Sequence, residues 1–175
     1  MDILCYPNDL LRRKTQTVTQ FDDQLRQTAE MMFATVKRAN GVGLAATQVG
    51  LALRLCVIHL PPPQEGDVAM VNPLILERHE TVTSEEGCLS FPGIFIEIAR
   101  AARVKVRYQD LEGREHIAEV TGLTARAVQH ELDHLDGVLL LDKMTTIQRL
   151  AHRGELKMLE VRHQRRKDDK TRAAE

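Results

Sequence analysis

The sequence predicts a single domain of the α+β class. Helical and strand patterns do not alternate along the chain: one helical pattern comes first, several strand patterns follow, and a second helical region ends the sequence. A chain of 175 residues can bury a substantial core. Its 43% hydrophobic and 28% charged residues are ordinary for a globular protein. No segment repeats, so one domain is the simplest expectation.

The first long element is a helix over residues 21–38. Asp22 or Asp23 can cap its N-terminus, because a carboxylate accepts hydrogen bonds from the free N–H groups of the first turn. Asn40 and Gly41 follow where the helix would end. The apolar residues of this segment recur at helical spacing: Leu25, Ala29, Met32, Phe33 and Val36.

Several strands are expected after the glycine-rich loop at residues 41–50. The apolar run at residues 51–60 indicates a buried strand, and the proline-rich segment 61–67 indicates a surface connection. A turn at residues 111–114 separates the last two strands. The further strands are predicted at residues 68–76, 103–109 and 115–120.

A second helix carries residues 130–134. Thr121 or Thr124 can cap it, and Gly137 lies where it would end. Its apolar residues give it enough surface to lie inside the fold: Leu123, Ala127, Val128, Leu135 and Val138.

The C-terminal segment differs from the rest of the chain in charge. Helical propensity runs from residue 145 to about 167, and we expect the last eight residues to fray. Residues 143–175 carry ten Lys or Arg against five Asp or Glu, whereas the preceding 142 residues carry 14 basic and 20 acidic residues. We therefore divide the chain into a body at residues 1–145 and a basic helical extension at 146–175. A charged terminal helix is most often a solvated surface.

No membrane or secretory segment is expected. No stretch approaches the ~18 apolar residues of a membrane span, and the N-terminus lacks a basic region followed by an apolar run. Three cysteines without a spaced framework favour a reducing cytoplasm. A net charge of −1 gives no general reason to expect DNA or an anionic membrane as a partner.

Residues 130–134 read His-Glu-Leu-Asp-His, which is an HExxH pattern. On a helix, His130 and His134 lie one turn apart on the same face, so both imidazoles can reach one metal ion. Glu131 between them can serve as a general base toward water. The pattern predicts a metallohydrolase, but such a site needs a third protein ligand and one open position.

Candidates for the third ligand lie on both sides of HExxH. Downstream, His152, Glu155 and Glu160 are the nearest, but they stand in the basic tail without a motif. Upstream, Cys88 follows Gly87 in a segment expected to be irregular, where its sulfur could reach a metal, and we favour it. The other cysteines, Cys5 and Cys56, are expected to be small core residues.

With these residues in place, the chain resembles the peptide deformylase family. Three motifs mark that family in this order: GxGLAAxQ, EGCLS and QHExDHLxG. They stand here without substitution at residues 41–48, 86–90 and 129–137. The resemblance covers the chain to about residue 145. It implies antiparallel or mixed β-sheets around a central HExxH helix, with a further helix at the C-terminus.

The resemblance implies hydrolysis of the N-formyl group from the initiator methionine of nascent bacterial polypeptides, with release of formate. Cys88, His130 and His134 would bind one divalent metal ion. The resemblance favours iron(II) in the cell, and a thiolate with two imidazoles also suits zinc, nickel or cobalt.

The resemblance also implies three catalytic groups. Glu131 would move a proton from the attacking water to the departing amine. The Gln48 side-chain amide and the Leu89 backbone N–H, together with the metal, would stabilise the oxyanion that forms at the formyl carbon.

A peptide-binding groove follows from the same resemblance. Gly43 and Gly87 would let backbone approach closely, so the peptide could bind as an added strand. The slot for the methionine side chain would be lined by Val42, Leu123, Ala127 and the His130 ring, with Arg126 near its mouth. Core packing is an equal alternative for the three apolar residues.

Two positions depart from the family pattern. Phe95 stands where many relatives carry an arginine seven residues after the cysteine. Ser84 stands where an apolar pocket residue is frequent. These departures leave open the peptide affinity and side-chain preference, but not the reaction.

Three functions remain to be distinguished: an active deformylase acting on formyl-Met nascent peptides, a non-catalytic ribosome-associated paralogue, and a general HExxH metallopeptidase. A protein that has lost activity tends to lose Gln48, Cys88 or Glu131, and this chain keeps all three. Related enzymes also suggest that the basic tail contacts ribosomal RNA near the peptide exit. The candidate residues are Arg149, Arg153, Lys157, Arg162, Arg165, Arg166 and Lys167.

Overall fold

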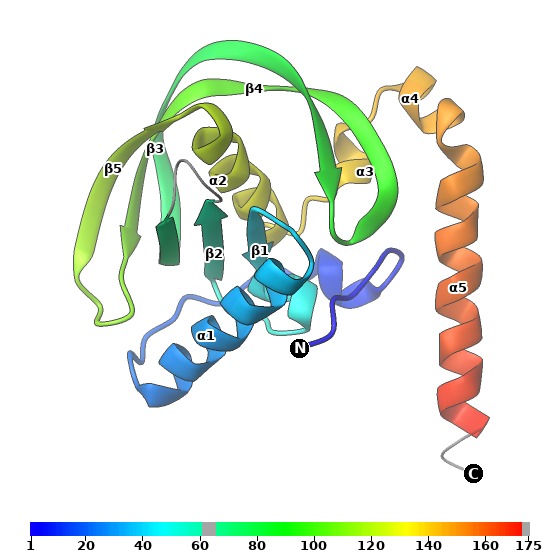
Figure 1. Cartoon of the computed structure of the whole chain (residues 1–175), viewed down its shortest axis with the longest axis horizontal. Helices are drawn as coiled ribbons and strands as arrows, with labels where there is room; N and C mark the ends of the chain where they lie inside the picture. Colours follow the sequence, from blue (N-terminus) through cyan, green and yellow to red (C-terminus); the bar gives the residue numbers. More distant parts are fainter. Residues whose placement is uncertain (61–65, 173–175) are drawn as a thin grey trace.

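The computed structural model describes residues 1–60 and 66–172, and the side chains as far as residue 169. One five-stranded sheet forms its centre, and every neighbouring pair of strands is antiparallel (Figure 1). The predicted α+β class is confirmed. In sheet order the strands are β1 (Gly43–Ala45), β2 (Leu55–Leu60), β3 (Gly66–Cys88), β4 (Phe91–Gln109) and β5 (Glu115–Thr121).

Helices lie before, within and after this run of strands. Among the described residues, two 3-10 turns, η1 (Asp9–Arg12) and η2 (Ala46–Val49), accompany five α-helices. The α-helices are α1 (Asp23–Arg38), α2 (Gly122–Leu135), α3 (Leu140–Lys143), α4 (Thr146–Ala151) and α5 (Arg153–Arg172). Helix α2 carries the HExxH residues.

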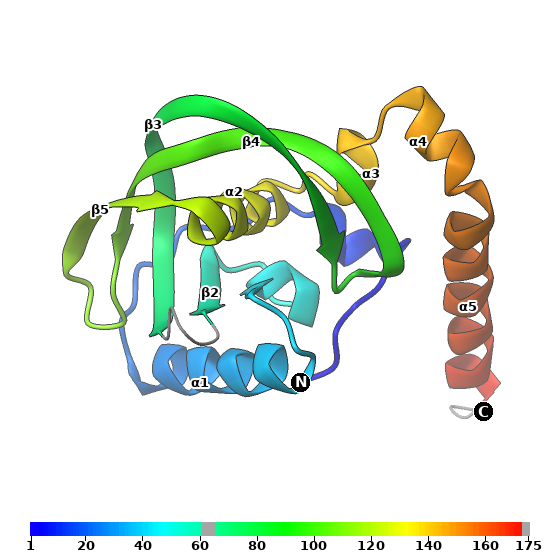
Figure 2. The ribbon, with the colours of Figure 1, turned by 45° about the horizontal axis from the view of Figure 1, so that its top comes forward.

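The two faces of the sheet build two separate apolar cores, because successive side chains of a strand point to opposite faces. Leu55 and Val57 of β2 pack with the apolar face of α1, which begins at its predicted cap: Asp22 Oδ1 accepts a hydrogen bond from Leu25 N at 3.0 Å. Cys56 and Ile58 point the other way and pack with α2. The sheet thus separates α1 from the HExxH helix (Figure 2).

Strands β3 and β4 are much longer than predicted and form one curved hairpin that arches over α2 (Figures 1 and 2). The sequence indicated strands only at residues 68–76 and 103–109. In the outer half of the hairpin, charged residues and two glycines lower the intrinsic strand propensity. The buried face nevertheless alternates regularly, with Ile94, Ile96 and Ile98 turned inward. Of the predicted connection 61–67, residues 66 and 67 belong to β3 and residues 61–65 lie outside the described residues.

The C-terminal region is two helices rather than the single predicted one. Helix α4 ends at Ala151, His152 interrupts it, and α5 then continues to Arg172, so the expected fraying does not begin at residue 168. Leu156 and Leu159 attach α5 to the body, where they pack in a third core with Phe91 and neighbouring residues of β4. The rest of α5 extends along one side of the molecule (Figure 1).

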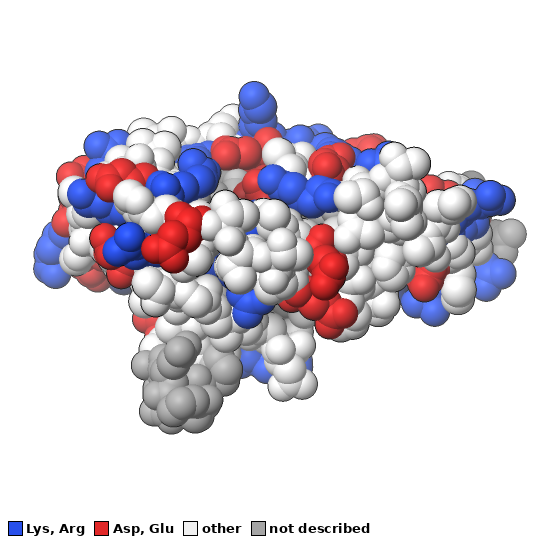
Figure 3. All heavy atoms as spheres, turned by 90° about the horizontal axis from the view of Figure 1, so that it is seen from above, with Lys and Arg blue, Asp and Glu red and all other residues white. Residues whose placement is uncertain are grey.

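The surface carries both signs of charge. Figure 3 shows Lys and Arg interspersed with Asp and Glu across one face of the molecule. In the part of the chain that the structure describes, no helix is long and apolar enough to cross a membrane.

Candidate metal centre

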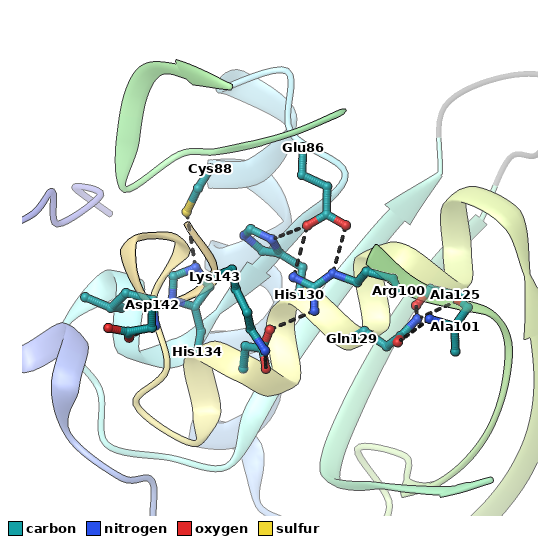
Figure 4. A network of polar contacts seen from close by, with 12 residues as sticks. Glu86, Cys88, Arg100, Ala101, Ala125, Gln129, His130, His134, Asp142 and Lys143 are labelled. Atoms are coloured by element: carbon teal, nitrogen blue, oxygen red, sulfur yellow. Dashed lines mark hydrogen bonds and ion pairs between the residues drawn. The ribbon is translucent and has the colours of Figure 1, made fainter. Parts of the chain in front are cut away.

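Cys88, His130 and His134 converge on one point. Their ligand atoms all lie within 4.8 Å of one another, and Cys88 Sγ is 3.2 Å from His134 Nε2 (Figure 4). The two histidines lie one turn apart on α2, as predicted, and Cys88 is the last residue of β3 rather than part of an irregular segment. Within residues 1–60 and 66–172, no second group of this kind forms. The downstream alternatives for the third ligand therefore have no support.

The electrostatics of the three residues match a site for a cation. Burial disfavours the Cys88 thiolate, but the His134 and His130 rings beside it outweigh burial and hold the pKa of Cys88 well below its usual range. The thiolate is the form that binds metals. His130 Nδ1 lies 3.3 Å from Glu86 Oε2, which leaves Nε2 as the ring nitrogen available to a metal.

Glu131 is fully enclosed beside these ligands. Its Oε2 has no hydrogen-bond partner among the described residues. Burial raises the pKa of Glu131 to about 6, although the neighbouring His130 and His134 lower it. Gly43 packs directly on the carboxylate: a Cβ at this position would lie 2.4 Å from Glu131 Oε1. The first and third motifs therefore meet here, and a side chain at residue 43 would displace the Glu131 carboxylate.

Gln48 is held with its amide nitrogen toward the metal ligands. Its Oε1 accepts a hydrogen bond from Ala45 N at 2.8 Å, and its Nε2 donates to Ser90 Oγ at 3.1 Å and lies 3.8 Å from Cys88 Sγ. Both Gln48 and Ser90 are buried. Ser90 was present in the EGCLS motif but received no role in the sequence prediction.

A cavity of about 480 Å³ opens onto this centre. The predicted site residues that line it are Val42, Gly43, Gln48, Gly87, Cys88, Leu89, Leu123, Arg126, Ala127, His130 and Glu131. His134 is the exception, because it lies behind Cys88 and is almost completely buried. Phe95 also lines the cavity, whereas Ser84 does not.

The Phe95 side chain packs against Gly87 of the neighbouring strand. It stands opposite Gly87 in the β3–β4 register, and its ring covers that glycine so closely that a Cβ on residue 87 would lie 2.6 Å from the ring. Its side chain is nevertheless 57% exposed. The cavity therefore has an aromatic wall at residue 95.

Comparison with known proteins agrees with this geometry. The family model described as polypeptide deformylase matches residues 1–150. The chain belongs to this family. A peptide deformylase of Thermotoga petrophila is 47% identical over 156 residues, which cover 88% of this chain and 93% of the relative. That of Alkalilimnicola ehrlichii is 43% identical over 162 residues, covering 91% and 90%.

Solved peptide deformylases have the same fold. The crystal structure of Arabidopsis thaliana peptide deformylase 1B with an inhibitor superposes with a TM-score of 0.90 at 37% identity, covering 95% of this chain and 93% of that one. The Thermotoga maritima enzyme gives a TM-score of 0.78 at 46% identity, covering 82% and 97%.

Peptide deformylases are metalloenzymes that remove the N-formyl group from the N-terminal methionine of nascent peptides, and this chain has that activity. The comparisons support neither a non-catalytic paralogue nor a general metallopeptidase.

Proposed function

We propose that Cys88, His130 and His134 hold the single divalent metal ion of the deformylase, with iron(II) as the ion in the cell. The observation that carries this proposal is the convergence of one thiolate and two imidazoles at the end of a cavity. These donors also suit zinc, nickel or cobalt in the purified protein. When bound, such an ion acts as a Lewis acid and activates water for attack on a carbonyl. We further propose that α2 is the central helix of the fold.

Glu131 is the general base in this proposal. Its unpartnered Oε2 is the atom available to a water molecule in the site, and a carboxylate held there can accept a proton from water and return it. The carboxylate takes a proton from the water that attacks the formyl carbon. It then returns this proton to the amide nitrogen as the C–N bond breaks, which leaves formate and the free amine of methionine.

Gln48 and Leu89 provide the contacts for the oxyanion. The hydrogen bond from Ala45 N to Gln48 Oε1 fixes the amide orientation, so that Nε2 faces the site. A donor that is already oriented stabilises developing charge without reorganisation during the reaction. The Leu89 backbone N–H follows Cys88 directly at the same edge of the cavity.

The cavity binds the formyl-Met end of the peptide. Gly43 and Gly87 both line the cavity, and an extended peptide would bind beside them as an added strand. Val42, Leu123 and Ala127 form the apolar slot for the unbranched methionine side chain. Arg126 lies at the mouth of this slot.

A direct assay tests these roles. Anaerobic turnover of formyl-Met peptides is measured with defined metals for the wild type, Glu131→Ala and Cys88→Ala. We expect Glu131→Ala to retain metal and to lower kcat by about 10² to 10⁴-fold, the usual contribution of a positioned general base. We expect Cys88→Ala to lose metal. Unchanged turnover in Glu131→Ala would contradict the role of Glu131 as the general base.

We also propose a division of labour along the chain. Residues 1–145 form the catalytic unit, and residues 146–175 form a basic extension that brings this cytoplasmic enzyme to the ribosome near the peptide exit. The basic residues of α5 with described side chains are largely exposed, whereas Leu156 and Leu159 attach the helix to the body. The charges can therefore serve a partner without disturbing the fold.

Charge reversal tests ribosome binding better than deletion of residues 146–175, because deletion would also remove Leu156 and Leu159 from the core. The variant replaces three exposed residues, Arg162, Arg165 and Arg166, with glutamate. We expect it to retain full turnover of free peptides and to lose co-sedimentation with ribosomes. Equal co-sedimentation of the variant and the wild type contradicts the proposal.

A further inference from the structure

Three residues of the family motifs have no part in the mechanism above: Glu86, Gln129 and Asp133. In the fold their side chains bind two consecutive residues of β4, Arg100 and Ala101, which lie outside all three motifs. Figure 4 shows Glu86 and Gln129 beside these two residues. The second and third motifs are thus connected through a strand that neither of them contains.

Arg100 is the centre of this connection. Its Nε and Nη2 donate to the two oxygens of Glu86 at 2.8 and 3.0 Å, and its Nη1 donates to Asp133 Oδ2 at 2.7 Å. The Arg100 and Glu86 side chains are only 6% and 8% exposed. Glu86 Oε2 in turn lies 3.3 Å from His130 Nδ1. A continuous chain of contacts therefore leads from Arg100 to a metal ligand.

Gln129 fixes the strand that carries Arg100. Its side-chain amide accepts a hydrogen bond from Ala101 N at 3.1 Å and donates to Ala101 O at 2.9 Å. One side chain of α2 thus pairs with β4 as a neighbouring strand would. Because Ala101 follows Arg100 directly, these bonds hold β4 at a constant distance from the HExxH helix.

Arg100 also lies between two cavities. Glu86 lines the substrate cavity, whereas Arg100 and Asp133 line a second cavity of about 530 Å³. The outer end of the chain of contacts continues from Asp133 to Lys143, whose Nζ is 3.1 Å from Asp133 Oδ1. The buried Glu86–Arg100 pair therefore lies between the two cavities. The metal ligand His130 is on the Glu86 side, and the second cavity is on the Arg100 side.

A carboxylate that holds the second nitrogen of a metal-binding histidine fixes the ring orientation and tautomer. The Glu86 carboxylate, which does this for His130, is itself buried, and a buried charge needs a partner of opposite sign. The planar guanidinium of arginine meets both oxygens of one carboxylate at once, which lysine cannot do. The three contacts of residue 100 therefore fit arginine better than lysine.

We propose that Arg100 is a positioning residue for the metal: it acts through Glu86 to orient His130, and so raises the affinity of the site for a divalent ion. This inference rests on the metal site proposed above. It predicts that the loss of Arg100 weakens metal binding even though Arg100 touches neither metal nor substrate.

The test measures cobalt(II) binding to the metal-free protein, by chelator competition and by the visible absorption of the bound ion. We expect Arg100→Met to bind cobalt roughly 10 to 100-fold more weakly, the usual effect of losing such an outer partner. Arg100→Lys should regain part of the affinity, because one ammonium can replace one of the contacts. Adding Arg100→Met to Glu86→Gln should cause little further loss, since both changes break the same link.

Arg54→Met is the matched control. Arg54 lines the same second cavity and pairs with Asp136 at 2.8 Å, but reaches no ligand. The Arg54→Met variant should lower the stability of the protein without changing its affinity for cobalt. If Arg100→Met does not fold, the Arg100→Lys and Glu86→Gln variants carry the test.

The outcomes separate this inference from the metal site itself. Wild-type cobalt affinity and absorption in folded Arg100 variants and in Glu86→Gln overturn the positioning role, whatever happens to their stability. His134→Ala, measured in parallel, should lose cobalt binding. If His134→Ala also binds normally, the proposed metal site fails, and the positioning role fails with it.

Discussion

Helices α2 and α5 differ in how much of their length the fold encloses. Eight of the 14 residues of α2 are buried, including the polar Gln129, Glu131 and His134. Of the described side chains of α5, those of Leu156 and Leu159 are buried. A side chain acquires a defined orientation when neighbours surround it. Helix α2 can therefore hold catalytic side chains in fixed positions. Helix α5 presents charged side chains to solvent without fixing their positions.

The polar partners of the two helices show the same contrast. Polar side chains of α2 reach other elements, as Gln129 does to Ala101 on β4. On α5, Lys157 pairs with Glu160 at 3.0 Å and Gln164 donates to Asp168 at 2.9 Å, both within the helix. The contact that Glu160 makes outside the helix is a long hydrogen bond of 3.5 Å from the Tyr6 hydroxyl. Exposed pairs of this kind contribute little to stability. Changes in α2 should therefore be costly, and most changes in α5 should not.

Among the changes that test this comparison, the largest effect is expected at a residue that packs on α2. In Gly43→Ala the new Cβ would lie 2.4 Å from Glu131 Oε1, so the carboxylate must move. We expect kcat to fall by about 10²-fold, because a displacement of ~1 Å can have this effect on a catalytic group. The control is Gly154→Ala in α5, where no atom outside the helix lies within 4 Å. Equal kcat in the two variants would contradict the role of Gly43.

A second prediction concerns the attachment of α5. Leu156→Ala should lower the free energy of unfolding by about 2 kcal/mol, near the low end for buried leucines because the site lies at the edge of the core. Met158, two residues further along, is 56% exposed. Met158→Ala should change stability by less than about 0.5 kcal/mol. Chemical denaturation measures both, and equal losses would mean that α5 is not anchored by its leucines.

The pH dependence of stability gives a smaller effect. The folded-state pKa of Glu131 is raised from 4.5 to about 6, so between these values the folded protein binds more protons than the unfolded chain. Its contribution to stability is therefore lost as the pH rises through this window. At about 1.4 kcal/mol for each pKa unit, the loss is at most ~2 kcal/mol.

Metal-free protein is the sample for this measurement, since a bound cation would lower the same pKa. Glu131→Gln carries no charge at any pH, so its stability relative to the wild type should increase as the pH rises from 4.5 to 6. Denaturation curves at both pH values decide the point. A difference that is independent of pH means that Glu131 is not the group responsible.

The smallest effect is expected on the exposed face of α5. Arg165→Glu should leave the free energy of unfolding within about 0.5 kcal/mol of the wild type and should not alter kcat for free formyl-Met peptides. Arg165 is exposed and makes no ion pair with the described residues. A clear loss of turnover would show that the helix influences the active site directly.

Local signals in the sequence were enough for several elements. Asp22 caps α1 as expected, and the three motifs identify residues that do meet around one cavity. Such signals act over a few residues, so they can be read without knowing the fold. The HExxH spacing belongs to the same class, because helix geometry alone brings two side chains four residues apart onto one face.

Other features depended on residues far away in the chain. The outer halves of β3 and β4 carry weak strand propensity. The inward isoleucines of β4 pack in the same core as the C-terminal helices, and β3 pairs with β4 along this length. The break at His152 and the regular helix beyond residue 167 were not indicated by the loosely periodic pattern either. Packing overrides local preference in such segments.

The sequence by itself determined the family, the reaction and the three residues most suited to hold the metal, because these depend on short motifs whose chemistry is local. Only the tertiary structure brought Cys88 to within 3.2 Å of His134, and only it revealed Arg100 as the partner of Glu86. Arg100 belongs to no motif and follows no spacing. Its role arises because the antiparallel hairpin pairs Glu86 with Ile96 and Arg100 with Val82, and both side chains then meet beside α2, where a buried carboxylate needs a cation.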